Sequence, residues 1–171
     1  MERPKGIRFV TQTAMFFALT LLVQAFGFPQ MLTGPLVNAF LLLSTIFSGI
    51  LSGIIIGLFT PWVALLRGIL PAPLSPMVPF IMVGNGALVT VFGLLAKRKS
   101  LSFEIVGVCL GALVKYLILS QAVRFLVAVP PPVARAMQVP QLVTALLGGA
   151  VALSLSRAVE RTRLPGKRAS G

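Results

Sequence analysis

The sequence predicts an all-α membrane protein, a compact bundle of six transmembrane helices with both termini in the cytoplasm. Of its 171 residues, 57% are hydrophobic and only 11% are charged, whereas soluble globular domains carry about 25% charged residues. The mean hydropathy is +0.98, and the apolar runs are continuous rather than alternating as in a membrane barrel. No polar run is long enough for a separate soluble module, so we expect one membrane domain over residues 1–171.

Six apolar segments supply the helices. The first follows a short basic stretch and has about 20 mostly apolar residues, enough to cross a hydrocarbon core of ~30 Å. The last two follow the basic "AKRKS" segment and are joined by "PPPVARAMQ". The predicted spans are residues 9–28, 36–47, 51–66, 76–96, 103–129 and 139–155.

The second and third spans depend on the distribution of basic residues. The uncharged region from Pro35 to Leu66 is too long for one upright helix and short for two full ones. If all three basic clusters are cytoplasmic, an even number of spans separates each from the next. The region must then cross twice, with a tight turn near Ser48 to Gly53. The clusters are Arg3, Lys5 and Arg8; Lys97, Arg98 and Lys99; and Arg157, Arg161, Arg163, Lys167 and Arg168 in a basic cytoplasmic tail over residues 156–171.

A formal net charge of +12 is also typical of proteins that bind nucleic acids, because Lys and Arg neutralise phosphates. Here the charges lie between apolar spans and fit the positive-inside rule. We therefore interpret them as topological anchors at the lipid bilayer and expect no nucleic-acid partner.

The residue types exclude most catalytic chemistry. The chain has no histidine and a single cysteine, Cys109, so we expect no metal site, no disulfide and no Ser-His-Asp arrangement. The acids Glu2, Glu104 and Glu160 all fall at predicted cytoplasmic helix ends, where they cannot form a catalytic pair inside the membrane. No phosphate-binding loop is present. We expect neither an enzyme nor a cofactor.

Several cationic and polar residues fall in the outer half of the predicted bundle. Lys115 lies about 18 Å into the fifth span, and small residues on its helical face direct it into the bundle. A buried lysine is costly and indicates a functional site. Each of these residues also has a purely structural interpretation. Lys115 could snorkel to the interface, and Asn38 and Asn85 could form interhelical hydrogen bonds. Arg124 could be an interfacial anchor, and Tyr116 could lie in the core. The candidate substrate-binding residues are Arg67, Asn85, Lys115, Asn38, Tyr116, Gln121 and Arg124.

These cations have no acid among them, so an anionic small molecule fits best. The proline-rich segment "RGILPAPLSPMVPFIMVGN" precedes and begins the fourth span. Pro71, Pro73 and Pro76 are expected to forbid a helix there and to make a semi-rigid lid, with Arg67 at its hinge and Asn85 beneath it. The alternative is a stiff connector with an interfacial arginine.

On the first span, "AMFFA" places Ala14 and Ala18 one turn apart. Small residues at this spacing let another helix approach closely, either from the bundle or from a partner.

Together, the six spans, the alanine pair, "TGPLVNAF", the charged proline-rich segment and the "KRK" turn resemble the substrate-binding S components of energy-coupling factor (ECF) transporters. The resemblance covers nearly the whole chain. It implies a high-affinity capture subunit for a vitamin or related micronutrient in a prokaryotic cell membrane, with ATP hydrolysis supplied by a transmembrane T component and two ATPases. In this family Ala14 and Ala18 would contact the T component, and Arg67, Asn85, Lys115 and Asn38 would face the substrate.

The missing acids disfavour a thiamin-like cation, and the missing histidine excludes the nickel and cobalt members. An anionic vitamin such as pantothenate, or a lipoate- or folate-like carboxylate, suits the charges better. The alternatives are a structural or assembly subunit without its own ligand and, less favoured, a small membrane enzyme that uses Lys or Ser chemistry.

Overall fold

The computed structural model describes residues 5–163, and most of them are helical. Their elements are α1 (Lys5–Ala25), α2 (Gln30–Ser48), α3 (Ile50–Leu66), the 3-10 helix η1 (Ala72–Met77), α4 (Val78–Ala96), α5 (Leu101–Gln121), the π-helix η2 (Ala122–Leu126), α6 (Pro131–Ala136) and α7 (Val139–Arg163). The part of the chain that is described contains no strand. The all-α prediction is confirmed.

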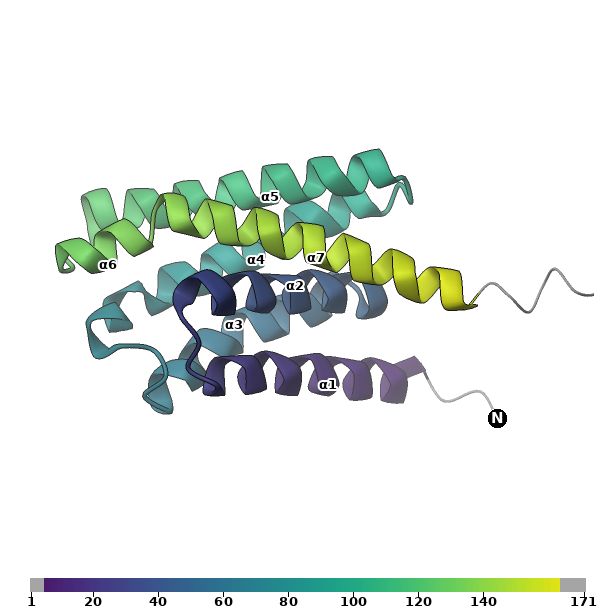
Figure 1. Ribbon diagram of the computed structural model, residues 1–171, viewed down its shortest axis with the longest axis horizontal. Coiled ribbons are helices and arrows are strands. Elements are labelled where there is room, and N and C mark those ends of the chain that lie inside the picture. Colours follow the sequence, from purple (N-terminus) through teal and green to yellow (C-terminus); the bar gives the residue numbers. More distant parts are fainter. Residues whose placement is uncertain (1–4, 164–171) are drawn as a thin grey trace, which may run out of the picture.

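The six long helices, α1 to α5 and α7, run along the long axis of the molecule (Figure 1). Five segments are long and apolar enough to cross a membrane, and α3 is a shorter apolar helix of 17 residues. The most extensive contacts run between α4 and α5 and between α2 and α7. These helices form the six-helix membrane bundle that the apolar segments predict.

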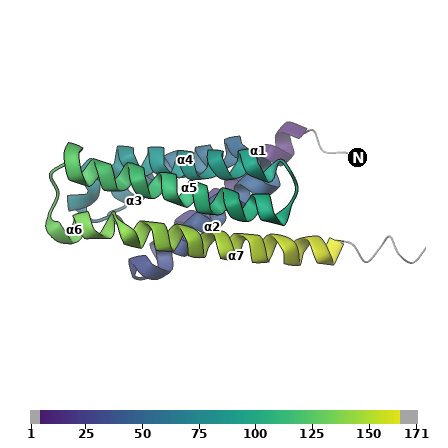
Figure 2. The same cartoon turned by 90° about the horizontal axis from the view of Figure 1, so that it is seen from above.

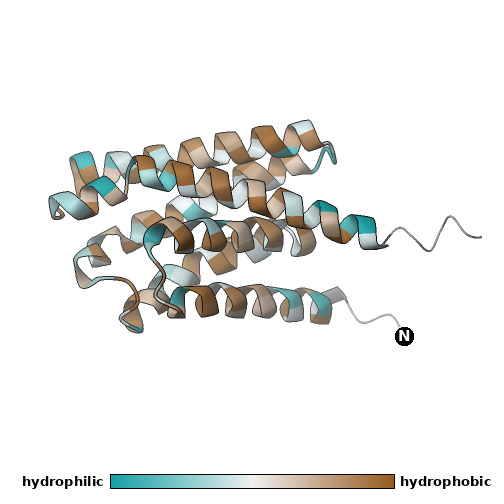
Figure 3. Cartoon of the chain, viewed as in Figure 1, coloured by the Kyte–Doolittle hydropathy of each residue, from teal (hydrophilic) through white to brown (hydrophobic). Residues whose placement is uncertain are grey.

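The described residues of the three basic clusters lie at one end of the bundle. This basic end holds the beginning of α1, the α2–α3 turn, the α4–α5 turn and the end of α7, whereas the opposite loop end holds residues 26–29, 67–77 and 122–138 (Figures 1 and 2). An even number of long helices separates each cluster from the next, as expected if all three clusters lie on the same side of the membrane. Hydrophilic residues concentrate toward the two ends, and apolar residues cover the middle (Figure 3).

The turn between α2 and α3 is tighter than predicted. The expected turn covered Ser48 to Gly53, but only Gly49 interrupts the two helices. Its φ of 95° lies in a region that residues with a Cβ rarely adopt. One glycine therefore reverses the chain, and Ser48 before it and residues 50–53 after it are helical.

Several predicted span boundaries differ from the observed helices. The second helix begins at Gln30, before Pro35, because a proline near a helix start removes only one early hydrogen bond. The fifth span is not one α-helix to residue 129: it becomes the π-helix η2, where Val127 N donates to Ala122 O, five residues earlier, at 2.9 Å. The connection after it contains α6.

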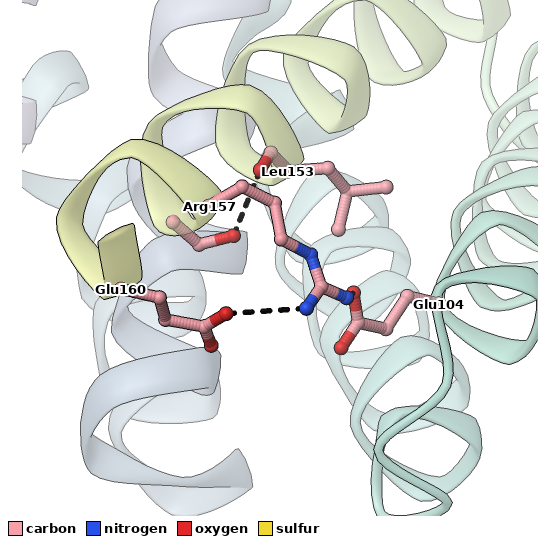
Figure 4. Close-up of polar contacts among 5 residues, drawn as sticks. Glu104, Leu153, Arg157 and Glu160 are labelled. Atoms are coloured by element: carbon pink, nitrogen blue, oxygen red, sulfur yellow. Dashed lines mark hydrogen bonds and ion pairs between the residues drawn. The ribbon is translucent and has the colours of Figure 1, made fainter. Parts of the chain in front are cut away.

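The last helix is longer than the predicted span. α7 runs to Arg163, so residues 156–163 of the predicted tail are helical, and residues 164–171 lie outside the described residues. Arg157 on α7 donates to Glu104 on α5 at 2.6 Å and to Glu160 at 3.1 Å (Figure 4). These partly exposed ion pairs contribute at most about 1 kcal/mol each, and they connect the end of α7 to α5.

The proline-rich segment is helical, contrary to the prediction. Residues 72–77 form η1, in which Leu74 N donates to Pro71 O at 2.8 Å and Val78 N donates to Ser75 O. A short 3-10 helix leaves its first amides unbonded, so the missing N–H of Pro73 costs little there. Prolines exclude a long α-helix from this segment but not a short 3-10 helix.

The buried side chains form two apolar clusters. The larger one lies among α1, α2, α3, α4, α5 and α7 and includes Leu41, Leu42, Leu88 and Phe92. The smaller one lies at the loop end and consists of Met77, Leu119, Ala122 and Met137. Polar residues are buried between these two clusters, and they form the candidate site.

Candidate functional site

Lys115 is the central residue of the candidate site. It lies on α5, its side chain points into the bundle, and it is 4% exposed. Its Nζ donates to Asn38 Oδ1 on α2 at 2.7 Å and to Asn85 Oδ1 on α4 at 2.8 Å. An ammonium buried in apolar surroundings needs such partners. Three helices therefore converge on one cation.

Asn85 is held in place by a second hydrogen bond, to a backbone carbonyl that a proline in α3 leaves without its helical donor. Pro61 lies inside α3 and has no N–H, so the carbonyl of Gly57, four residues earlier, lacks its helical donor. Asn85 Nδ2 donates to that carbonyl at 3.1 Å. With Nδ2 engaged in this way, Asn85 must turn its oxygen toward Lys115.

Small residues bring the helices close enough for these bonds. A Cβ added at Gly57 would lie 2.9 Å from Asn85 Cβ, and one added at Gly148 would lie 2.6 Å from Asn38 Cβ. On α4, a Cβ at Gly84 would lie 3.2 Å from Lys115 Cγ. These glycines permit the close approach of α3 to Asn85, of α7 to Asn38 and of α4 to Lys115.

The charge of Lys115 has no acidic partner in the described part of the chain. The described carboxylates, Glu104 and Glu160, are at the basic end and bond to Arg157. Amide oxygens solvate the ammonium, but they do not neutralise it. Of its three N–H groups, two are donated to the asparagines, and one is left for a further acceptor.

Lys115, Asn38 and Asn85 line a cavity of about 90 Å³. Toward the loop end it leads into a vestibule of about 400 Å³, which shares Gln24, Gln30, Thr33, Ala64, Leu70, Leu74 and Met137 with the cavity. Gln24 Oε1 is buried and has no hydrogen-bond partner among the described residues. The vestibule is otherwise mostly apolar, with η1 and α6 on its walls.

The structure separates the predicted site residues into three groups. Asn38, Asn85 and Lys115 lie together, as described. Tyr116, Gln121 and Arg124 line a different pocket on the flank of α5, of about 220 Å³. Arg67 caps the end of α3, is exposed, and lines neither the cavity nor the vestibule.

Sequence reasoning missed two parts of this site. Gln141 on α7 is 6% exposed and lines the cavity, and a glutamine beside Pro140 in an apolar span was the signal that could have found it. Met137 and α6 close the vestibule. No group of residues that could hold a metal ion occurs in residues 5–163.

The alanine pair lies on the outside of the bundle. Ala14 and Ala18 are both exposed on α1, next to other exposed apolar residues of that helix such as Val10, Met15 and Leu22. Neither alanine packs inside the bundle. The alternative that a helix of the bundle itself packs against this alanine pair is therefore wrong.

A comparison with protein families places the whole bundle in one of them. The family model described as "ECF transporter, substrate-specific component" matches residues 8–159, which include α2 to α6 entirely and most of α1 and α7. The comparisons with curated proteins and with solved structures each found no match.

Proposed function

The chain belongs to the family of ECF transporter substrate-specific components, and we propose that it captures a small anionic molecule in the cavity around Lys115. As a member of this family it is a substrate-specific subunit of a transporter in a membrane. The observation that carries the proposed charge of the ligand is the buried, acid-free Lys115, whose third N–H is available at the cavity.

The polar atoms of the cavity suit a carboxylate. Lys115 can donate one hydrogen bond and supply the opposite charge. Asn38 turns its oxygen toward Lys115, so its NH2 group is oriented as a second donor. A cavity of about 90 Å³ holds a carboxylate and a few attached atoms, and the rest of the ligand must lie in the vestibule.

The lining of the vestibule indicates the chemical character of the rest of the ligand. Its walls are aliphatic and proline-rich, and Phe28 is its single aromatic residue. Stacking of a large flat ring therefore has little support, whereas a flexible chain fits. The unpartnered Gln24 Oε1 can accept a hydrogen bond from a ligand N–H or O–H. A small carboxylate vitamin with a flexible chain, of the pantothenate or lipoate kind, matches these features better than a folate-like one.

In this proposal the loop end faces outward and the basic end faces the cytoplasm of a prokaryotic cell, since basic residues gather on the cytoplasmic side. Arg8, the 97–99 cluster, Arg157 and Arg161 all lie at the basic end. The vestibule then opens to the outside, as a subunit for uptake requires. The role of Arg67 in binding stays a prediction, because the residue lies outside both cavities.

The transport energy would come from partners. A transmembrane T component and two ATPases would supply it, and the chain itself would not be an enzyme. The exposed Ala14 and Ala18 support a docking surface on α1, since small residues allow a partner helix to approach closely.

Native mass spectrometry of the purified protein, combined with binding of labelled pantothenate and lipoate as probes, tests this function. We expect a carboxylate ligand on the wild type, its loss in Lys115→Met, and unchanged binding in Lys97→Met, which removes an exposed lysine at the basic end. Retention of the same ligand by Lys115→Met would contradict the proposal. A purely structural subunit would bind none of these probes and would tolerate Lys115→Met, because that change removes a costly buried charge.

A further inference from the structure

A second polar pocket lies at the loop end on the flank of α5. It has a volume of about 220 Å³ and shares no lining residue with the Lys115 cavity. Leu119 and Met137, which are buried in the smaller apolar cluster, occupy the adjoining positions of α5 and of the α6–α7 turn. Its lining residues are Tyr116, Leu117, Ser120, Gln121, Arg124 and Gln138.

The pocket is rich in hydrogen-bond donors. Tyr116, Ser120 and Arg124 are spaced by four residues, so a phenol, a hydroxyl and a guanidinium follow one stripe of α5. Gln121 and Gln138 add amide groups, and no carboxylate lines the pocket. Such a set of donors around one arginine suits a phosphate or another oxyanion.

Ser120 provides independent support for a ligand. Hydroxyls inside helices usually donate to the carbonyl one turn earlier, and Thr20, Thr45 and Thr60 do so at 2.6–2.9 Å. Ser120 Oγ is buried and has no partner among the described residues. No described residue therefore uses the hydrogen-bonding capacity of this hydroxyl, and Ser120 lines the pocket. Together with Gln24 Oε1 it makes up the unpartnered buried side-chain atoms of the described chain.

The depth and surroundings of the pocket indicate a lipid. The apolar segment that contains α5 and η2 ends at Leu126, so Arg124 lies at the level of the headgroups. Tyr116 is about 12 Å deeper along the helix. Leu117, Phe125 and Leu126 are 45%, 74% and 68% exposed, as residues that face lipid chains are.

We propose that this pocket binds the headgroup of an anionic phospholipid, with Arg124 on the phosphate and Ser120, about 6 Å deeper along the helix, on the ester oxygens below it. An anionic lipid is favoured over a zwitterionic one for a physical reason. The described carboxylates lie at the basic end, so none is available to pair with a choline or ethanolamine cation. This inference does not depend on which substrate the Lys115 cavity takes.

Native mass spectrometry with dioleoyl phosphatidylglycerol and dioleoyl phosphatidylcholine, added in equal amounts to detergent-purified protein, tests the inference. We expect the wild type to retain phosphatidylglycerol preferentially. Arg124→Gln should weaken this binding about tenfold, as expected for one lost charge-assisted pair. Arg135→Gln is the matched control, because Arg135 is an exposed arginine at the same end but outside the pocket; Lys115→Met should also leave lipid binding unchanged.

Three results would overturn the proposal. Equal retention of the two lipids by the wild type would remove the specificity for an anionic headgroup. An equal effect of Arg124→Gln and Arg135→Gln would show that only net charge matters. Displacement of the lipid by micromolar glycerol 3-phosphate would assign the pocket to a free anion instead. A smaller loss in Ser120→Ala, which removes one hydroxyl, would support the proposed geometry.

Discussion

Replacing Asn85 by alanine should destabilise the bundle in a way that Pro61→Ala partly repairs. Asn85→Ala removes an acceptor from Lys115 and leaves the carbonyl of Gly57, which Pro61 deprives of its helical donor, without a partner. Hydrogen bonds inside membranes average about 0.6 kcal/mol and reach about 1.7 kcal/mol. Two such bonds therefore predict a loss of about 1–3 kcal/mol in the free energy of unfolding.

Alanine at position 61 restores an N–H that can donate to Gly57 O within α3. In the wild-type background this donor competes with Asn85 Nδ2, so Pro61→Ala should change stability little. In the Asn85→Ala background it satisfies an orphan carbonyl. The double variant should therefore be more stable than the sum of the single effects predicts, by about 1 kcal/mol, which is in the range of coupling between residues in contact.

Reversible unfolding in mixed detergent micelles, with SDS as denaturant, measures the four free energies of this cycle. Pro35→Ala provides the control, because Pro35 also lies inside a helix but on α2, where its missing donor concerns Met31 O and not Gly57 O. Its cycle with Asn85→Ala should be additive. Additivity in the Pro61 cycle would refute the argument that Asn85 replaces the missing helical donor.

Three further predictions concern packing, charge and docking. Gly57→Ala puts a Cβ 2.9 Å from Asn85 Cβ and should cost about 1–3 kcal/mol of unfolding free energy, whereas Gly86→Ala, with nothing within 4 Å, should be neutral or stabilising in the same SDS titration. Arg157→Gln removes both ion pairs and should lower stability by at most about 2 kcal/mol, because the pairs with Glu104 and Glu160 are partly exposed; a larger loss would show that the pairs are more important than their exposure indicates. Ala14→Trp should abolish co-purification with the T component and leave ligand binding intact; normal co-purification would disprove the docking role.

The bundle could be predicted because its signals, apolar runs and basic clusters, can be read directly along the sequence. Apolar runs of membrane length and the parity of basic clusters determine how many helices there are and at which end each cluster lies. Lys115 was correctly predicted to point inward, because lipid exposure of a charge is costly and small residues share its face. Helix ends were less predictable. Pro73 was expected to forbid a helix, but it lies at the start of η1, where few hydrogen bonds are lost. Pro35 lies inside α2, although the predicted span began after it.

The candidate site was harder to predict. The position of a residue along its helix gives its depth in the membrane, but not which neighbouring helix its side chain faces. Lys115 and Tyr116 are neighbours in sequence, yet successive residues of an α-helix point about 100° apart. The sequence places Tyr116, Gln121 and Arg124 in the outer half of the bundle, as it does Lys115, but in the structure they line a pocket on another face of α5. The link from Pro61 to Asn85 depends on how α3 and α4 are rotated relative to each other, and no local pattern specifies that rotation.

The unequal size of the two apolar clusters has a consequence for motion. The larger cluster has twelve buried members, whereas the one at the loop end has four, two of them methionines. Local opening costs less where fewer apolar contacts are broken, and unbranched methionines repack easily. Amides in η1, η2 and α6 should therefore exchange with deuterium much faster than those near Leu42 and Phe92. The vestibule can open by moving its short helical segments, while the long helices and the bonds around Asn85 stay in place.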